Sequence, residues 1–541
     1  MTALFMTNFV VAQQDTVFWF AAPDISTAEG QSPIYLRFQS YSNPATITVS
    51  QPANGAFVPV VLNLTANDAD SLNLTPFIAS IESPSANTIN TTGIKISSTS
   101  NITAYYEVAA ASNREIFSLK GSKSLGTNFY TPFQKFWNNA VVAPATFSSI
   151  EIVATQDNTT VLITPKTNIT GHVANITYSI NLDEGETYSA RDTDVNASTS
   201  LAGSIVSSDK PIALTLFSGA MSNGGCTSSV GDQITPTDYL GTEYIIRKGT
   251  AANERVFILA TENATDITIT NSGTTNTLIN WGETYTLALT DNINFIETSK
   301  PVYVFHVSGT GCSLAGAQVP SLFCAGKYDQ TFSRSKSDSL GLIIYTRAGF
   351  EDSFELNGNS SLITAGDFSV VPGTGGEFVV ALKYFNTTDV PVNSYNIVTN
   401  SEDIFGMGVI HGQTGTDVSY AYLSEFQSYP FVDAGVSEDT VCANIPYPLT
   451  GIVGGGSVTG SWGGSGYGTF DLGLTALTNT YIPSHLDTII TPVTIILSST
   501  GPCPVMKDTL ILHVNPAPIV NASADQTVCA NNADVTLDGA V

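Results

Sequence analysis

Charged side chains are scarce in this 541-residue chain, and positive charge is the scarcest. Lys and Arg number 19 against 46 Asp and Glu, so charged residues are 12% of the chain and the formal net charge is −27. A typical soluble domain carries about 25% charged residues. Binding to nucleic acid needs clusters of Lys and Arg, which are absent. Aromatic residues still reach 10%, which excludes a disordered chain kept in solution by charge.

Several motifs of catalysis and metal binding are also missing. The sequence has no G-x-S-x-G nucleophile turn, no P-loop, and no H-E-x-x-H or H-x-H spacing among its five histidines. Its six cysteines include no C-x-x-C pair, which argues against zinc and thioredoxin-like sites. No stretch approaches the roughly 20 apolar residues of a membrane-spanning helix. We expect no enzyme and no catalytic residues, although a carboxylate pair assembled from distant strands stays open.

The first twelve residues form an apolar, uncharged run with small side chains at Val10 and Ala12. This run resembles the hydrophobic region and cleavage site of a signal peptide, where the hydrophobic region is about 7–15 residues long. The basic residues that usually precede such a region are missing, so the alternative is a buried first strand. We expect a truncated signal peptide over residues 1–12, and a protein that is secreted or displayed at the cell surface.

Short runs of alternating apolar and polar residues, bounded by Asn, Asp, Gly and Pro, predict strands throughout the chain. In residues 149–163 (SIEIVATQDNTTVLI), two such runs flank a turn at Gln156, Asp157 and Asn158. This segment predicts a β-hairpin. Because similar runs recur and helix signals are few, the sequence predicts an all-β fold.

One unit of roughly 100 residues recurs along the chain before residue 428. The run ATQDNTTVLIT at 154–164 returns as ATENATDITIT at 260–270, and the turn GETY at 185–188 returns at 282–285. Six or seven strands in each unit favour tandem antiparallel β-sandwiches or jelly rolls, with a β-propeller-like arrangement as the alternative. The four predicted units cover about 15–135, 145–250, 251–335 and 336–427.

The ordered motifs of these units carry a family resemblance. The D-N-T-T turns, the G-E-T-Y turns, the S-x-K-P strands that end in S-G, and the start at 18–23 (FWFAAP) resemble the IgGFc-binding protein N-terminal domain family over about residues 15–427. The resemblance implies a binding head made of related β units. It does not imply that the ligand of this chain is immunoglobulin.

A different pattern begins after Pro430. Residues 431–516 contain V-C, G-S-W, G-Y-G-T-F and Y-I-P-S in order, and they resemble the PKD/Ig-like repeats of giant surface adhesins of Bacteroidetes-type bacteria, gliding-motility adhesins included. The resemblance implies an Ig-like β-sandwich in an extracellular stalk. A similar opening returns at 518–541, which predicts the start of a second, truncated module of a longer chain. Residues 428–434 are the predicted linker.

Cysteine placement predicts two disulfides. Cys442 stands near the first strand of the 431–516 module and Cys503 just before its last strand, and the first and last strands of such a sandwich commonly approach each other. Cys312 and Cys324 close a short loop between strands. The predicted pairs are therefore Cys442–Cys503 and Cys312–Cys324.

The two remaining cysteines have no mate in this scheme. Cys226 is predicted to be a buried thiol, and Cys529 to pair beyond the end of the sequence. In the alternative, all six cysteines are reduced, which would fit a cytosolic protein and contradict export.

One acidic run is a calcium candidate. Asp192, Asp194 and Asn196 have the spacing of the first three ligands of an EF-hand loop, but Ala197 replaces the turn glycine and Gly203 replaces the bidentate glutamate. The alternative is an isolated acidic turn. No other metal or cofactor is expected.

These features together predict a fragment of an extracellular adhesin, with a β-rich binding head on an Ig-like stalk. Its expected partners are glycans or glycoproteins, together with further domains of the same long chain, because surfaces rich in Tyr, Asn and Ser suit such contacts. The first alternative is a structural surface-layer or filament protein without a specific ligand. The second is a fragment of a secreted polysaccharide-acting enzyme.

Overall fold

A computed structural model describes residues 14–25, 30, 32–110, 113–140, 142–143, 145–322, 324–413, 417–426, 430–454, 457, 459–500, 503, 505–517 and 520–540. The chain forms two compact units, Met1–Ser428 and Tyr429–Val541, which we call the head and the small unit. The predicted signal peptide at 1–12 lies outside the described residues, as do 428 and 429 of the predicted linker. The second half of that linker was predicted wrongly, because Phe431–Asp433 form a strand, β32, that pairs with β35 (Ile452–Gly454).

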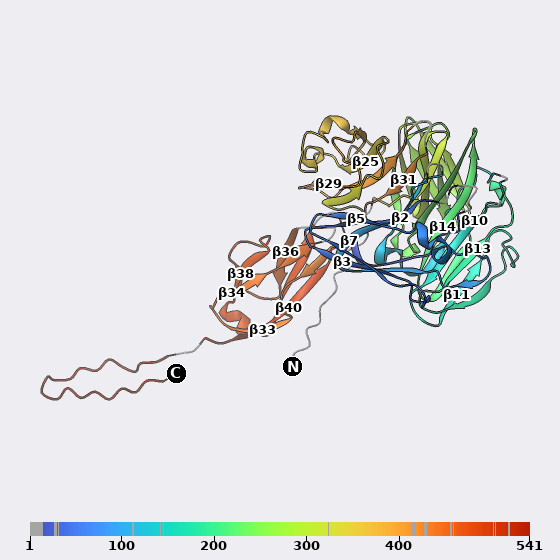
Figure 1. The fold of residues 1–541 in the computed structure, drawn as a ribbon. Coiled ribbons are helices and arrows are strands. Elements are labelled where there is room, and N and C mark those ends of the chain that lie inside the picture. Colours follow the sequence, from blue (N-terminus) through green and yellow to red (C-terminus); the bar gives the residue numbers. More distant parts are fainter. Residues whose placement is uncertain are drawn as a thin grey trace. The chain divides into compact units, whose positions relative to one another are not determined.

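The head consists of antiparallel sheets grouped into four sandwiches, A to D, in chain order (Figure 1). This confirms the predicted all-β class and the tandem sandwiches. The strands of sandwich A are β1 (Gln14–Phe20), β2 (Ile34–Ser40), β3 (Ala45–Ser50), β4 (Val60–Leu64), β5 (Ala69–Asn73), β7 (Ile94–Val108) and β8 (Glu115–Ser118). Those of sandwich B are β9 (Gly126–Tyr130), β10 (Ser148–Ala154), β11 (Thr159–Thr164), β12 (Tyr178–Leu182), β13 (Thr187–Arg191), β14 (Ile205–Asn223) and β15 (Cys226–Ile234), and β6 (Ile89–Asn90) joins their sheet.

Sandwich C repeats the plan of B, and sandwich D is a reduced copy. The strands of C are β16 (Gly241–Arg247), β17 (Thr250–Ala251), β18 (Arg255–Ala260), β19 (Thr265–Thr270), β20 (Thr274–Ile279), β21 (Thr284–Ala288), β22 (Ile293–Gly311) and β23 (Ser313–Gln318). Those of D are β24 (Asp329–Ser333), β25 (Leu340–Arg347), β26 (Phe354–Leu356), β27 (Ser369–Val370), β28 (Phe378–Phe385), β29 (Tyr395–Asn400), β30 (Gly406–His411) and β31 (Ser419–Tyr422).

Helical segments in the described part of the chain are short. They comprise the α-helix α1 (Ile78–Ile81) and the 3-10 turns η1 (Thr75–Phe77), η2 (Gly121–Ser124), η3 (Ala197–Thr199), η4 (Thr237–Tyr239), η5 (Glu351–Ser353), η6 (Ala365–Asp367) and, in the small unit, η7 (His485–Thr488). Among the described residues, no helix is long and apolar enough to cross a bilayer.

A long strand organises each of the first three sandwiches. In sandwich B, the first part of β14 pairs with β9 and β11, and its second part pairs with β10 and β15. Inward-facing apolar residues of both halves, among them Ile152, Val161 and Leu214, share one core. The two half-sheets therefore face each other, and β14 passes from one to the other.

The predicted hairpin at 149–163 is wrong in its pairing. Strands β10 and β11 both exist, but each pairs with β14 and neither pairs with the other. The turn between them carries the chain from one half-sheet to the next. A hairpin and such a corner produce the same alternation of apolar residues, because both strands present one face to a core. Strands β18 and β19 repeat this corner in sandwich C.

Each later sandwich begins one strand before the sequence repeat suggested. Gly126–Tyr130 pair with β14, and Gly241–Arg247 pair with β22, so they belong to sandwiches B and C. The predicted units 15–135 and 145–250 had assigned them to the preceding repeat. Pairing with a strand about 50 to 80 residues later leaves no local signature.

The last strands of the four sandwiches meet in a closed ring. Strand β8 contacts β15, β15 contacts β23, β23 contacts β31, and β31 contacts β8. The approach is close: a Cβ on Gly231 of β15 would lie 2.5 Å from a ring atom of Phe117 of β8. The repeats are thus sandwiches, as predicted, and their circular order is the feature that the propeller-like alternative had anticipated.

The small unit is a separate β-sandwich with its own core around Trp462, Tyr481 and Leu512. In the described residues 520–540, every side chain is exposed, Leu537 to 87%. Besides β32 and β35, the strands of the small unit are β33 (Glu438–Cys442), β34 (Tyr447–Thr450), β36 (Thr459–Gly464), β37 (Thr469–Phe470), β38 (Thr478–Ile482), β39 (Val493–Thr500) and β40 (Lys507–Asn515).

Candidate binding surfaces

The G-E-T-Y turn, found as a sequence motif, is a docking element between sandwiches. Gly185 and Gly282 both have positive φ, 82° and 72°, as a tight turn requires. A Cβ on Gly93 of sandwich A would lie 2.5 Å from the Gly185 carbonyl oxygen, and one on Gly203 of sandwich B would lie 2.5 Å from the Gly282 carbonyl oxygen. The turn of each sandwich therefore packs against the preceding sandwich at a glycine.

Buried charges join the strands of the ring. Lys120 and Asp232 form a fully buried ion pair with 2.9 Å between Nζ and Oδ2. Asp232 also accepts hydrogen bonds from the backbone N–H groups of Ser118 and Gln318, in the sandwiches on either side. Burial raises the pKa of Asp232 and lowers that of Lys120, and the attraction between the two partners opposes both shifts.

A second buried carboxyl, Glu115 of β8, has no ion-pair partner among the described residues. Its Oε2 accepts hydrogen bonds from the backbone N–H groups of Gly231 and Gly316, in sandwiches B and C. Burial raises its pKa well above the ordinary value, while the hydrogen bonds from the backbone N–H groups oppose the shift. Glu115 and Asp232 act as connectors between strand edges that would otherwise leave N–H groups unpaired.

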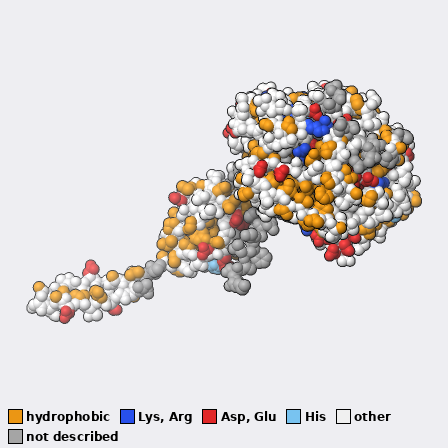
Figure 2. Space-filling view, viewed as in Figure 1, with side chains coloured by type: hydrophobic (Ala, Val, Ile, Leu, Met, Phe, Trp, Pro, Cys, Tyr) orange, Lys and Arg blue, Asp and Glu red, His pale blue; other side chains and the backbone are white. Residues whose placement is uncertain are grey.

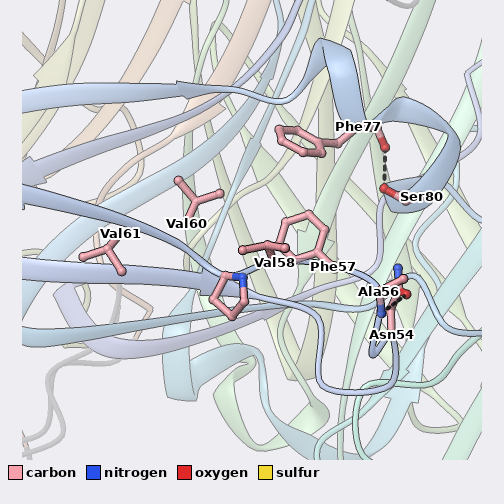
Figure 3. Close-up of a pocket in the computed structure, with 9 residues that line it drawn as sticks. Asn54, Ala56, Phe57, Val58, Val60, Val61, Phe77 and Ser80 are labelled. Atoms are coloured by element: carbon pink, nitrogen blue, oxygen red, sulfur yellow. Dashed lines mark hydrogen bonds between the residues drawn. The ribbon is translucent and has the colours of Figure 1, made fainter.

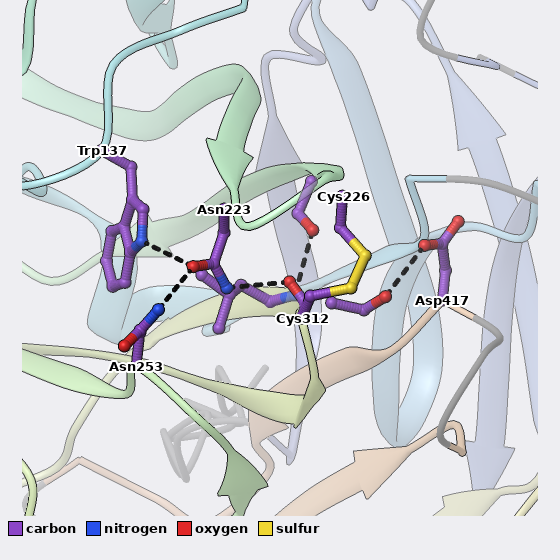
Figure 4. Close-up of a disulfide and its surroundings, with 9 residues drawn as sticks. Trp137, Asn223, Cys226, Asn253, Cys312 and Asp417 are labelled. Carbon is purple, nitrogen blue, oxygen red and sulfur yellow. Dashed lines mark hydrogen bonds between the residues drawn. A yellow bond between two sulfur atoms is a disulfide. The ribbon is translucent and has the colours of Figure 1, made fainter.

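One disulfide links sandwiches B and C, and it corrects the predicted pairing. Cys312 is bonded to Cys226, with Cα atoms 5.7 Å apart and a separation of 86 positions in the sequence (Figure 4). The predicted Cys312–Cys324 pair is therefore wrong, and so is the prediction that Cys226 is a thiol. The two bonded cysteines occupy equivalent hairpins of neighbouring repeats, and the ring brings those hairpins together.

The side chain of Asn223 forms hydrogen bonds beside this disulfide. It donates a hydrogen bond to the Cys312 carbonyl and accepts others from Trp137 Nε1 and Asn253 Nδ2, as Figure 4 shows. Asn223 is buried and ends β14. The disulfide therefore lies in a hydrogen-bonded junction between two sandwiches.

The predicted Cys442–Cys503 disulfide is also wrong, because Cys442 is a free, half-buried thiol. Cys442 ends β33, which pairs in parallel with β40. Cys529 is a free, exposed thiol within the chain. Proximity of first and last strands in a sandwich does not by itself bring two given sulfurs together.

Sandwich A carries an open, apolar hollow of about 560 Å³ at its surface (Figure 3). It lies between the β3–β4 loop and the segment of η1 and α1. The side chains of Phe57 and Phe77 form its wall, with ring centroids 5.5 Å apart. Val58 is 78% exposed and Val61 56%. The lining residues are Asn54, Ala56, Phe57, Val58, Pro59, Val60, Val61, Phe77 and Ser80.

The polar groups at this hollow are engaged within the head. Asn54 donates to Gln51 Oε1 and accepts from the backbone N–H of Ala56, and the Ser80 hydroxyl donates to the Phe77 carbonyl. The hollow thus offers apolar area with its hydrogen-bonding capacity largely used. It suits an apolar side chain better than the hydroxyl groups of a sugar. The sequence did not single out these residues, because an exposed Val or Phe has no local signature.

The surrounding surface agrees with the composition. On the face that Figure 2 presents, hydrophobic side chains gather over part of the head, and Lys and Arg make only a few small spots.

The calcium candidates do not form a carboxylate cluster. Asp192 is buried and accepts a hydrogen bond from the backbone N–H of Ser148, and burial raises its pKa to about 7. Asp194 accepts hydrogen bonds from the backbone and side-chain amides of Asn196. Within the described ranges, no group of three His, Cys, Asp or Glu side chains could hold a metal ion. Asp194 and Asn196 are thus bonded to each other within their turn, whereas Asp192 is bonded to strand β10.

The fold and these surfaces define an all-β binding head without a metal cluster in its described part. The sequence model of the IgGFc-binding protein family matches residues 117–411, more than half of the chain, from the end of β8 to the end of β30. The chain belongs to this family. The matched residues include the disulfide and strands β9 to β30 of the three later sandwiches, whereas the hollow at 54–80 precedes them.

No curated protein matches the sequence. Solved structures that align with the chain include the I9–I11 tandem from titin, with 10% identity over 51% of this chain and 100% of that chain and a TM-score of 0.16. The insect immune protein hemolin aligns with 11% identity over 68% and 100%, at a TM-score of 0.16. The eight N-terminal Ig domains of a DSCAM isoform align with 12% identity over 93% and 71%, at a TM-score of 0.13.

Proposed function

We propose that this chain is an extracellular adhesin fragment whose head binds a glycoprotein. The observation that carries the proposal is the family match across sandwiches B, C and D. A disulfide between two repeats supports an oxidising compartment, because disulfides persist outside the cytosol. The description of the family names binding to the Fc part of immunoglobulin G, so that protein is one ligand to test.

The apolar hollow of sandwich A is the proposed contact for the protein part of the ligand. Covering Val58, Val61 and the rims of Phe57 and Phe77 removes apolar area from water at about 25 cal/mol per Å². Because Asn54 and Ser80 already have partners, an apolar side chain can enter without leaving polar groups unpaired. An aliphatic or aromatic side chain of the ligand fits this chemistry.

The small unit serves in this proposal as a PKD/Ig-like spacer of the kind found in gliding-motility adhesins. Support comes from its compact, separate core and from the motifs quoted above. Further modules of the same chain would extend the spacer from the exposed 520–540 segment.

No catalytic role is included. Two of the carboxyls with raised pKa, Glu82 and Glu151, are 4% and 0% exposed. A substrate could not reach them in this conformation. A polysaccharide-acting enzyme would release new reducing ends from polysaccharide, which is a direct assay for that alternative.

The test is binding of the full chain to immobilised immunoglobulin G Fc, mucin-type glycoproteins and their deglycosylated forms. We expect Val58→Asp to weaken binding by at least about tenfold, or 1.4 kcal/mol. Val173→Asp is the matched control, because Val173 is also highly exposed (66%) but lies in sandwich B. Absence of binding to every glycoprotein would refute the proposal in favour of a structural surface-layer or filament protein. Equal losses in both variants would exclude the hollow.

A further inference from the structure

We propose that the seam between sandwiches B and C binds an anionic sugar through Trp281, Tyr130, Lys135 and Lys166. The inference rests on the proposed function and names the sugar part of the ligand. Tyr130 belongs to β9, and Lys135 lies in the segment after it. Lys166 lies in the segment after β11, and Trp281 lies in the turn between β20 and β21. All four lie within the residues that match the family.

Trp281 differs from the other tryptophans in its exposure. The chain has four, all of them described, and Trp19, Trp137 and Trp462 are at most 4% exposed, whereas Trp281 is 43% exposed. Nearly half of its surface is therefore open to a ligand. Exposed tryptophan faces provide the apolar platform on which a sugar ring can stack.

The indole is also held in one orientation. Its Nε1–H donates a hydrogen bond to the Tyr130 hydroxyl at 2.8 Å, and the two rings meet edge to face with centroids 6.1 Å apart. Gly282, the next residue, packs against Gly203 of sandwich B and fixes the turn. A platform fixed before binding loses little conformational entropy when the ligand arrives.

Two lysines provide the positive charge. A Cβ on Gly282 would lie 3.7 Å from Lys166 Nζ, so this ammonium group stands beside the turn that carries Trp281. Lys135 is close enough to be affected by Lys166: burial first, and then repulsion from Lys166, lower the pKa of Lys135, while Glu283 opposes the shift. Among the described residues, neither lysine forms an ion pair, whereas Lys95, Lys120 and Lys383 do.

The carboxylate of Glu283 lies in the turn that carries Trp281. Glu283 is exposed, and its Oε2 accepts a hydrogen bond from the backbone N–H of Asn280, within the turn. Beside this turn, Lys135 and Lys166 outnumber Glu283 in a chain whose formal charge is −27. This combination of aromatic platform and positive charge suits a sugar that carries a carboxylate or a sulfate group.

The experiment measures binding of sialyllactose, sulfated lactose and plain lactose to the full chain, by titration calorimetry and by the fluorescence of Trp281. We expect an anionic sugar to bind at least about tenfold more tightly than lactose, with an affinity that falls as salt rises. A response to sialyllactose alone assigns the carboxylate, and a response to sulfated lactose alone assigns the sulfate. Equal binding of all three sugars, or of none, would overturn the inference.

Variants separate this inference from the proposed function. Trp281→Ala should abolish sugar binding, and Lys166→Gln should reduce the affinity for the anionic sugar to that for lactose. Lys507→Gln, an exposed lysine of the small unit, is the control. If glycoprotein binding persists in Trp281→Ala and after removal of sialic acid and sulfate, the inference fails while the proposed function stands. If the chain binds anionic sugars but no glycoprotein, the proposed function fails.

Discussion

The head and the small unit are both all-β, yet they use their few charged side chains differently. In the head, Lys120–Asp232 is fully buried, and Lys327–Glu425 is nearly so. In the small unit, the ion pair among the described residues is His513–Glu438, whose side chains are 40% and 64% exposed. The head thus buries some of its ion pairs and leaves others half exposed, whereas the described ion pair of the small unit lies in water.

Ring closure explains the difference. When β8, β15, β23 and β31 pack around one centre, their backbone N–H groups lose access to water and need partners from side chains. Glu115 and Asp232 supply them. The small unit is one sandwich, and its edge strands can be solvated. Charged side chains are few in this chain, and several of them are buried in the head, where their hydrogen bonds and ion pairs join the sandwiches.

The largest expected effect comes from breaking the buried pair. Asp232→Ala leaves Lys120 buried without its partner and should lower the free energy of unfolding of the head by about 3–5 kcal/mol. Asp232→Asn keeps an acceptor and should cost less. Glu438→Ala, in the exposed pair of the small unit, should change stability by less than about 0.5 kcal/mol. Urea unfolding of the three variants measures this, and equal losses in the first and third would contradict the comparison.

Removal of the disulfide between sandwiches B and C should be the next largest effect. The double variant Cys226→Ser with Cys312→Ser opens a loop of 86 residues and should destabilise the head by about 2–4 kcal/mol. Cys442→Ser removes a free thiol and should be neutral. Thermal unfolding distinguishes them, and a neutral double variant would indicate that the remaining contacts of the seam already fix it.

The glycine docking of the GETY turn can be tested by adding one methyl group. Gly93→Ala places a Cβ 2.5 Å from the Gly185 oxygen and should cost about 1–3 kcal/mol, because the backbone of the next sandwich must move. Gly273→Ala is the matched control, since nothing lies within 4 Å of its Cβ. Chemical unfolding provides the measurement. A loss as large in the control would mean that chain flexibility, and not docking, sets the effect.

Counted for a change of one pH unit, the smallest expected effect comes from Glu82. Burial, with repulsion from Asp24, raises the pKa of Glu82 to about 9. The folded head keeps a proton that the unfolded chain releases near pH 4.5, so stability falls as pH rises from about 4.5 to about 9, by up to about 1.4 kcal/mol per pH unit. Glu82→Gln should flatten this decline in the melting temperature of the head. A wild-type head that becomes more stable between pH 7 and pH 9 would contradict the assignment.

Local patterns predicted the strands, the repeats and the turn motif, because the alternation of apolar and polar residues and the glycine turns are properties of short segments. They could not predict which strands pair, so the corner between β10 and β11 was mistaken for a hairpin. Cys226 and Cys312 follow matching S-G steps of neighbouring repeats. Equal positions in adjacent repeats were the signal for their bond, and it has meaning only once the repeats close into a ring.

The candidate sites depend even more on tertiary contacts. The hollow at Val58 and the indole of Trp281 are candidate sites because no other part of the head covers these side chains. The solvent exposure of a single side chain cannot be predicted from the sequence around it. The spacing of Asp192 and Asp194 matched a ligand motif, but Asp192 accepts a hydrogen bond from Ser148 of β10, and Asp194 accepts one from Asn196 in its own turn.

Scanning calorimetry of the full chain tests the central claim most directly, namely that four sandwiches form one closed, cooperative head beside an independent small unit. The account predicts two transitions, and it predicts that Asp232→Ala lowers the temperature of one of them and leaves the other unchanged. Separate transitions for individual sandwiches of the head, or a single transition that Asp232→Ala shifts as a whole, would contradict it.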